Sequence, residues 1–272
     1  MMAAFSRGHH RFADAAPWIL DDPFALLLVG PRWRRIAENS ARIFPPDLDR
    51  RTRAGIALRT RYAEDRLLTG AFTQYVLLGA GLDAFAWRRP DLLRSIRVFE
   101  VDHPASQTWK RQRVDDLGLP TNSQQTFVPV DFEHQSLADR LTDVGFEWGQ
   151  ATLFSWLGVT MYLTPDAVEA TLRTVAGAAP GSEIAFSYGV DRTLMDDDGR
   201  RFAEILAPVV ADVGETLSGG TTPGDLDRLV AGCGLRVVDH PTHHDLVGRY
   251  FVGRPDGLRP YTAEGLVTAA AP

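Results

Sequence analysis

The sequence predicts an α/β protein with a doubly wound, mostly parallel sheet, N-terminal helices and an antiparallel edge. From residue 74 onward, short apolar runs alternate with helical segments, which is typical of parallel strands joined by crossover helices. Several of these segments contain continuous apolar runs, as expected of strands that helices cover on both faces. The 272 residues, 44% of them hydrophobic, are enough for one large domain with a sizeable core.

We expect one domain, residues 1–272, in four consecutive segments. Residues 1–70 read as mostly helical, and residues 74–190 form the core of the sheet. Residues 191–220 interrupt the alternation of strands and helices, as a helical cap insertion or a plain connector would. Residues 221–272 supply a C-terminal helix and the closing strands.

Within the first segment, two stretches predict helices. "DDPFALLLVG" contains a helix start, with Asp21 or Asp22 as the cap and Pro23 in the first turn. The apolar residues of "AGIALRTRYAEDRLLTGA", residues 54–71, recur at roughly helical spacing. The two prolines of "IFPPDLDR" predict a break between helices.

Five strands are predicted in the core, and a helix follows the fourth. In that helix Thr164 is the expected cap, Pro165 takes the first position and Gly177 marks the exit. Two later runs, "RVVDH" and "YFVGRP", predict a turn-linked antiparallel pair at one edge of the sheet. The predicted core strands are Gln74–Leu78, Ile96–Val101, Thr126–Val130, Thr152–Trp156 and Glu183–Tyr188.

Composition and charge argue against several classes of protein. A net charge of −6 and a pI of about 5.6 give no overall attraction to nucleic acid. The longest apolar run near the N-terminus, "FALLLVG", is too short to span a bilayer, and no signal region is seen, so we expect no membrane span. Cys233 is the only cysteine, which favours a reducing cytoplasm, and we expect it to be a small buried residue after a helix.

The stretch "YVLLGAGLDAFAWR", residues 75–88, is the first indication of a ligand site. A strand runs into Gly79 and Gly81, and a helix is expected to follow. Such a turn presents free backbone N–H groups, and glycine lets a ligand approach the backbone. With Ala84 the stretch satisfies the relaxed dinucleotide pattern G-x-G-x-x-G/A. A tight corner without a ligand is the alternative interpretation, and Asp83 either caps the helix or reaches the ligand.

Acidic residues follow at the ends of the next two strands. Glu100 and Asp102 share one face of the second strand, and either can accept hydrogen bonds from ribose hydroxyls; the alternative is two exposed acids at a strand end. Asp131 follows the third strand, where it can bond an adenine amino group while Phe132 packs on the base; the alternative is a helix cap. Together these strand ends predict a nucleoside in the crevice at the carboxyl ends of the strands.

Two cofactors fit a nucleoside site of this kind, NAD and S-adenosylmethionine. NAD would need a hydride-handling group, and no Tyr-x-x-x-Lys pair precedes Lys110, the only lysine. The stretch "TLFSWLGVTMYLTPD" offers an apolar and aromatic surface instead of a proton relay. These residues favour S-adenosylmethionine and leave hydride transfer as the second interpretation.

With these features in view, the sequence resembles the leucine carboxyl methyltransferase family, and within it a bacterial branch of S-adenosylmethionine-dependent O-methyltransferases. The resemblance runs from about Asp21 to about Val252, and the order and spacing of its pieces are specific. The pieces are "LDDPFALLLVG", "LRTRYAEDRL", "QYVLLGAGLDAFAWR", "VFEVDHPASQTWKR", "FVPVDFE", "FSWLGVTMYLTPDAV" and "TPGDLDRLVAGCGLRVVD".

The resemblance implies a Rossmann-like class I methyltransferase fold with a cap, and S-adenosylmethionine as the cofactor. It also implies an arginine for the methionine carboxylate, two glycines in the turn, an acid for the ribose, and an acid with an aromatic for the adenine. Arg59 matches the arginine for the methionine carboxylate, and Gly79 and Gly81 match the glycines of the turn. Asp102 matches the acid for the ribose, and Asp131 with Phe132 matches the pair for the adenine.

Three further positions bear on this match. Arg11 matches the family's N-terminal basic contact loosely. The family often has a glutamate where this chain has Leu157, so that acid is lost, or replaced by contacts from Ser155 or Trp156. Arg59 has no acid four residues later in the helix, so we expect its guanidinium to be free to grip a carboxylate at two points.

The expected partner is a small-molecule acceptor, with a carboxylate favoured over a phenol or other hydroxyl. A carboxylate is ionised at neutral pH and needs no general base, so no catalytic residue is assigned. Trp156 and Tyr162 are candidates for the acceptor pocket, with core packing as the alternative. His243 and His244 would point to opposite faces of a strand, so no metal site is expected. The alternatives to a methyltransferase are an NAD-dependent oxidoreductase and a catalytically silent nucleoside-binding protein; no oligomeric state is assigned.

Overall fold

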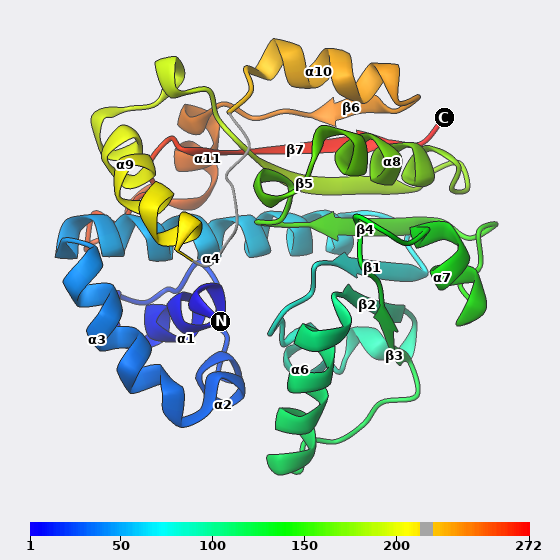
Figure 1. The fold of residues 1–272 in the computed structure, drawn as a ribbon, viewed down its shortest axis with the longest axis horizontal. Helices are drawn as coiled ribbons and strands as arrows, with labels where there is room; N and C mark the ends of the chain where they lie inside the picture. The colour runs from blue at the N-terminus through cyan, green and yellow to red at the C-terminus, as the bar shows by residue number, and fades with distance from the viewer. Residues whose placement is uncertain (213–219) are drawn as a thin grey trace.

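The computed structural model describes residues 1–212 and 220–272 and contains one seven-stranded sheet (Figure 1). The strand order is β3-β2-β1-β4-β5-β7-β6. Strands β1 to β5 are parallel, and β7 is antiparallel to both of its neighbours, which confirms the predicted fold class. The strands are β1 (Gln74–Leu78), β2 (Arg97–Asp102), β3 (Gln125–Pro129), β4 (Thr152–Trp156), β5 (Glu183–Gly189), β6 (Arg236–Asp239) and β7 (Glu264–Ala270).

All five core strands predicted from the sequence are present, and no boundary differs by more than one residue. β1 and β4 are buried at every position, because helices cover both faces of the sheet. The strand order reverses between β1 and β4, which lie side by side. In open α/β sheets, ligands bind outside the carboxyl ends of the strands at such a reversal.

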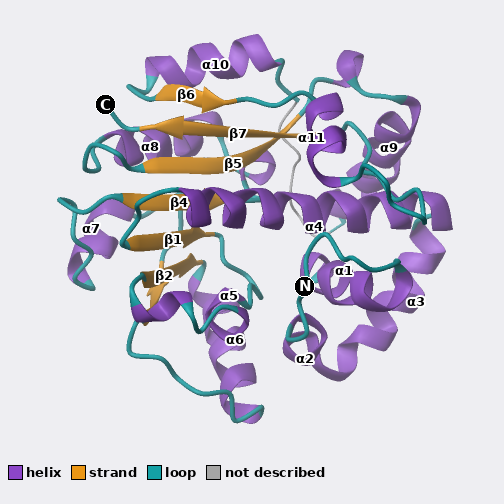
Figure 2. Cartoon of the chain, turned by 180° about the vertical axis from the view of Figure 1, so that it is seen from behind, coloured by secondary structure: helices purple, strands orange, loops and turns teal. Residues whose placement is uncertain are grey.

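Helices cover the sheet on both faces. α4 lies lengthwise across one face and packs Leu58 and Leu67 against apolar residues of β1, β4 and β7 (Figure 2). On the opposite face, α7, α8 and α10 contribute Leu141, Leu172 and Val230 to a second core. The longer helices are α1 (Met2–Ala13), α2 (Ala25–Val29), α3 (Trp33–Ile43), α4 (Pro46–Thr69), α5 (Phe85–Arg88), α6 (Pro104–Asp116), α7 (Leu137–Asp143), α8 (Pro165–Ala176), α9 (Asp197–Ala211), α10 (Pro223–Gly232) and α11 (His243–Tyr250).

Several helix ends are fixed by the residues that the sequence singles out. The Thr164 side chain accepts a hydrogen bond from the Ala167 N–H at 3.3 Å, which caps α8 as predicted. Asp22 accepts a bond from the Ala25 N–H at 3.0 Å where α2 begins. Cys233 is buried directly after α10, as expected.

The prediction of a closing strand at "YFVGRP" is wrong. Thr242 and Asp245 form a capping box, so the chain enters α11, and Tyr250 is the last residue of that helix. His243 and His244 therefore lie in the first helical turn and not in a strand. The closing strand is β7, which inserts between β5 and β6.

The segment 191–220, predicted as a cap insertion or a connector, contains α9, and its residues 213–219 lie outside the described part of the chain. Phe202 of α9 stacks between Phe44 and Tyr261, with ring centroids 5.6 and 4.4 Å apart. α9 is thus joined both to the end of α3 and to the segment that leads into β7.

A fully buried ion pair lies beneath the carboxyl end of β2. Lys110 of α6 is paired with Glu100, and both side chains are 1% exposed. Gln125 donates a second hydrogen bond to the Glu100 carboxylate at 2.8 Å. Burial raises the pKa of Glu100 above its usual range, against the opposing charge of Lys110.

We predict that Lys110→Met lowers the free energy of unfolding by about 3–5 kcal/mol at pH 8, because it leaves Glu100 buried without a counter-charge. The pKa of Glu100 in the folded state is raised above the unfolded value. The stability that protonated Glu100 contributes is therefore present at low pH and is lost as pH rises through the raised pKa. Urea unfolding should therefore show a smaller loss at pH 5 than at pH 8. The control is the double variant with Glu100→Gln, which removes this pH dependence; an equal loss at both pH values contradicts the argument.

Candidate functional site

The turn after β1 is built from two glycines with positive φ. Gly79 has φ of 69° and Gly81 has φ of 50°, a region that residues with a Cβ rarely adopt. The N–H groups of Gly79 and Ala80 both donate to the Val101 carbonyl, at 2.8 and 2.9 Å, which ties the turn to β2. A Cβ on Gly79 would overlap the side chain of Val159, so the turn after β1 also lies against the segment that follows β4.

Asp102 ends β2 and faces this turn. Its carboxylate accepts hydrogen bonds from the Gly81 N–H at 2.5 Å and from the His103 N–H at 2.7 Å. Burial raises the pKa of Asp102, and the two backbone hydrogen bonds act in the opposite direction. Of the two acids that the sequence offers on this strand, Glu100 is buried against Lys110, and Asp102 is the one beside the glycine turn.

Asp131 lies in the loop after β3. It accepts a hydrogen bond from the Glu133 N–H at 3.1 Å, which is the main cause of a lowered pKa, and it lies 3.1 Å from His134 Nδ1. His103 Nε2 lies 4.0 Å from the same carboxylate, so the loops after β2 and β3 meet here. The alternative role of Asp131 as a helix cap is wrong, because Ser136 caps α7.

Arg59 reaches the same edge of the sheet from α4. A Cβ on Gly158 would overlap its guanidinium, which places Arg59 against the turn after β4. Its Nη1 donates to Glu264 Oε1 at 2.9 Å, and the side chains are only 14% and 19% exposed. The expectation that Arg59 has no acidic partner is therefore wrong: the acid comes from the first residue of β7, not from its own helix.

Helix α1 covers the glycine turn from the other side. Arg7 donates through Nη2 to the Leu82 carbonyl at 2.7 Å and through Nε to Asp22 at 3.1 Å. Arg11, the loosely matched N-terminal basic residue, instead pairs with Asp21 at 2.5 Å. The N-terminal contact with the glycine turn is thus made by Arg7.

Asp83 caps the short helix α5, since its carboxylate accepts a bond from the Phe85 N–H at 2.6 Å. Burial would raise the pKa of Asp83, but the positive charges of Arg7, Arg88 and Lys110 hold it below its usual value. This bond agrees with one of the two roles that the sequence offers for Asp83, and the other, a contact with the ligand, stays a prediction.

The two candidates for an acceptor pocket differ in exposure. Trp156 is fully buried in the core, with the Phe132 ring centroid 6.3 Å away. Tyr162 is 38% exposed. The structure thus brings the glycine turn, Asp102 and Arg59 to one edge of the sheet around the ends of β1, β2 and β4. The assigned binding roles stay predictions.

The comparisons with known proteins agree with this architecture. The sequence model of the leucine carboxyl methyltransferase family matches residues 1–176. The chain belongs to the leucine carboxyl methyltransferase family. The match spans the N-terminal helices, the glycine turn and the strands up to β4.

Relatives in this family carry a common name. The chain is 32% identical to the "Putative S-adenosyl-L-methionine-dependent methyltransferase YktD" of Bacillus subtilis, over 95% of this chain and 92% of that protein. It is 34% identical to a protein of the same general name from Mycobacterium marinum, over 89% of this chain and 79% of the relative. The cofactor expected from the sequence is the one that these names print.

Solved structures support the fold. A duf574 family protein from Streptomyces avermitilis aligns with a TM-score of 0.64 and 16% identity, covering 90% of this chain and 94% of the other. A structure titled "putative methyltransferase" from Thermobifida fusca aligns with a TM-score of 0.61 and 18% identity, covering 90% and 91%. Within the described residues, no helix is long and apolar enough to cross a membrane, and no group of three or more His, Cys, Asp or Glu could hold a metal ion.

Position 157 is where this chain has a leucine and the resemblance to the leucine carboxyl methyltransferase family leads us to expect a glutamate. Leu157 packs at the edge of the core that α4 covers. The next residue, Gly158, touches the Arg59 guanidinium, and Glu264 supplies that guanidinium with an acid from another strand. Sequence reasoning misses Glu264 because 205 residues separate the two partners and no local pattern marks it.

We predict that Glu264→Ala lowers the free energy of unfolding by about 1.5–3 kcal/mol, because it removes a hydrogen bond between two charged, mostly buried groups. Glu264→Gln should recover part of the loss, since its amide oxygen can still accept from Arg59. Thermal and urea unfolding provide the measurement. Glu38→Ala, a truncation of an exposed acid in α3, is the matched control, and a loss no larger than that control refutes a role for the pair.

Proposed function

We propose that this member of the leucine carboxyl methyltransferase family transfers a methyl group from S-adenosylmethionine to an oxygen of a small molecule, with a carboxylate as the favoured acceptor. The observation that carries the proposal is the convergence of the glycine turn, Asp102 and Arg59 at the strand-order reversal between β1 and β4. The family and the names of the relatives give methyl transfer its support, and they give none to an NAD-dependent oxidoreductase or to a silent nucleoside-binding protein.

The residues at this edge fit the chemical groups of S-adenosylmethionine. Arg59 has five N–H donors, and Glu264 takes one of its nitrogens, which leaves donors for the methionine carboxylate. Asp102 has lone pairs left for ribose hydroxyls beyond its two backbone hydrogen bonds. Asp131 and Phe132, in the loop after β3, are assigned to the adenine, and Gly81, where a Cβ would meet no atom closer than 3.9 Å, keeps the backbone accessible.

When bound, S-adenosylmethionine supplies an electrophilic methyl group. The chain's own part is to bind and orient the two reactants and to exclude water. Holding the reactants in line is worth up to roughly 7–11 kcal/mol of the reaction barrier. A carboxylate acceptor, with a pKa near 4, is already ionised at neutral pH and requires no general base. In this proposal α9 forms the cap over the acceptor, and Tyr162 lines its pocket.

The cofactor assignment is testable by binding. Asp102→Asn keeps an oxygen for the Gly81 N–H but loses a carboxylate acceptor for the ribose, and Arg59→Ala loses the fork for the methionine carboxylate. Each should weaken the binding of S-adenosylhomocysteine at least tenfold, about 1.4 kcal/mol, in isothermal titration calorimetry. Asp166→Asn, at an exposed acid in α8, is the control. Unchanged affinity in both site variants would sink the assignment.

The acceptor class is testable by product chemistry. The enzyme is incubated with S-adenosylmethionine that carries a labelled methyl group and with a panel of small carboxylic acids and phenols. We expect a labelled product from which mild alkali releases the label, because methyl esters hydrolyse in mild alkali and methyl ethers do not. With a carboxylate acceptor, the initial rate should change little between pH 6 and 8, since no base has to be deprotonated. Alkali-stable label, with a rate that rises with pH, would overturn the carboxylate in favour of a phenol.

A further inference from the structure

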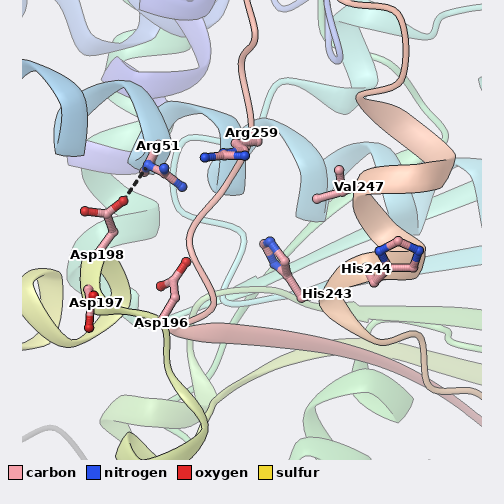
Figure 3. A pocket seen from close by; sticks show the side chains of 8 residues that line it. All are labelled: Arg51, Asp196, Asp197, Asp198, His243, His244, Val247 and Arg259. Carbon is pink, nitrogen blue, oxygen red and sulfur yellow. Dashed lines mark ion pairs between the residues drawn. The ribbon is translucent and has the colours of Figure 1, made fainter.

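A cavity lies beside the cofactor edge, and none of the residues that line it is assigned to the cofactor. It has a volume of about 610 Å³, in the usual range for small-molecule sites. Its walls come from α4, the start of α9, the start of α11 and the segment before β7 (Figure 3). Figure 3 shows Arg51, Arg259 and His243 directed into the space between these elements.

The acids that line this cavity are already engaged by protein groups. Asp198 of α9 pairs with Arg51 of α4 at 2.9 Å, a contact drawn in Figure 3. Asp196 caps α9 by accepting from the Gly199 N–H at 2.7 Å and also accepts from the Thr262 hydroxyl at 3.0 Å. Asp197 pairs with Arg200, and Asp196 accepts its bonds through Oδ1, so the cavity offers a ligand hydrogen-bond donors together with Asp196 Oδ2.

Two donors in the cavity have no such partner. Within residues 1–212 and 220–272, Arg259 and His243 make no hydrogen bond or ion pair. Arg51 uses its Nε on Asp198 and its Nη1 on the Pro260 carbonyl, so its Nη2 stays available. Burial is the main cause that lowers the pKa of His243; Asp196 raises it, and Arg51 and Arg259 lower it further. The acid Asp196 and the two arginines Arg51 and Arg259 thus act on this ring in opposite directions.

We propose that this cavity is a binding site for a small organic carboxylate, held by Arg259 and Arg51 with His243 as a third donor. A guanidinium fork matches the two oxygens of a carboxylate, and here two arginines from different segments face one space. Arg51 precedes Arg59 by eight residues on α4, about 12 Å along the helix axis, and His243 lines both this cavity and a smaller one beside Arg59 and Glu264. The donors of the proposed site come from α4, α11 and the segment before β7, so a bound carboxylate bridges these three parts of the chain.

The test measures binding of acetate, malonate and benzoate to the full chain by calorimetry at constant ionic strength. Acetamide, malonamide and benzamide serve as neutral counterparts of the same shape. We expect saturable binding of at least one carboxylate and none of its amide. Arg259→Gln should weaken that binding at least fivefold, and Arg94→Gln, which removes an exposed arginine between α5 and β2 that does not line the cavity, should leave it unchanged.

Affinity for S-adenosylhomocysteine separates this site from the cofactor site. Arg259→Gln should leave that affinity unchanged, so carboxylate binding is tested whether or not methyl transfer is confirmed. The proposal is overturned if none of the three carboxylates binds saturably, if the amides bind equally well, or if Arg259→Gln and Arg94→Gln behave alike. Far-ultraviolet circular dichroism of Arg259→Gln establishes that a loss of binding does not come from unfolding. Should that variant fail to fold, His243→Gln takes its place with the same expected loss.

Discussion

The turn after β1 is the constraint on which the rest of the site depends. Its glycines adopt positive φ, and its first two N–H groups are spent on the Val101 carbonyl, so the path of the chain is fixed between β1 and β2. The groups around it then have little freedom: Val159 fills the place that a side chain on Gly79 would need, and Asp102 bonds the Gly81 N–H. The position of the loops after β2 and β4 follows from this one turn.

The N-terminal helices are attached to that turn by buried charge. Arg7 of α1 reaches both Asp22 and the Leu82 carbonyl, and Arg88 of α5 is paired with Glu64 of α4. The side chains in these ion pairs are at most 8% exposed. Buried ion pairs add little net stability compared with apolar packing. Removing one partner, however, leaves a buried charge without a counter-charge, which is costly. Such pairs therefore fix which surfaces meet. Helices α1, α4 and α5 are held in register over the glycine turn in this way.

Much of the fold could be predicted from the sequence because its signals are local. Continuous apolar runs mark the five parallel strands, and Thr164 with Pro165 marks the start of α8, since strand burial and helix capping act within a few residues. The error at "YFVGRP" has a local cause as well, because the capping box formed by Thr242 and Asp245 outweighs a short apolar run.

The site was harder to predict than the fold, because its contacts join distant parts of the chain. Glu100 and Asp102 lie close to the glycines in sequence, at the next strand end; spacing finds both, and the family resemblance selects Asp102. Arg7 bonds a residue 75 positions away, and Glu264 bonds one 205 positions away. No periodicity or turn chemistry connects such partners; only the strand order and the antiparallel direction of β7 bring them together.

The place of β7 has a consequence for how the protein is made. β7 follows β1 to β6 in the described chain, yet it inserts between β5 and β6, and its first residue is the partner of Arg59. During synthesis β5 and β6 therefore exist for a time with open edges and no neighbour between them. The arginine assigned to the cofactor meets its acid only after β7 has been synthesised. Assembly of the finished sheet and completion of the cofactor edge are thus one event.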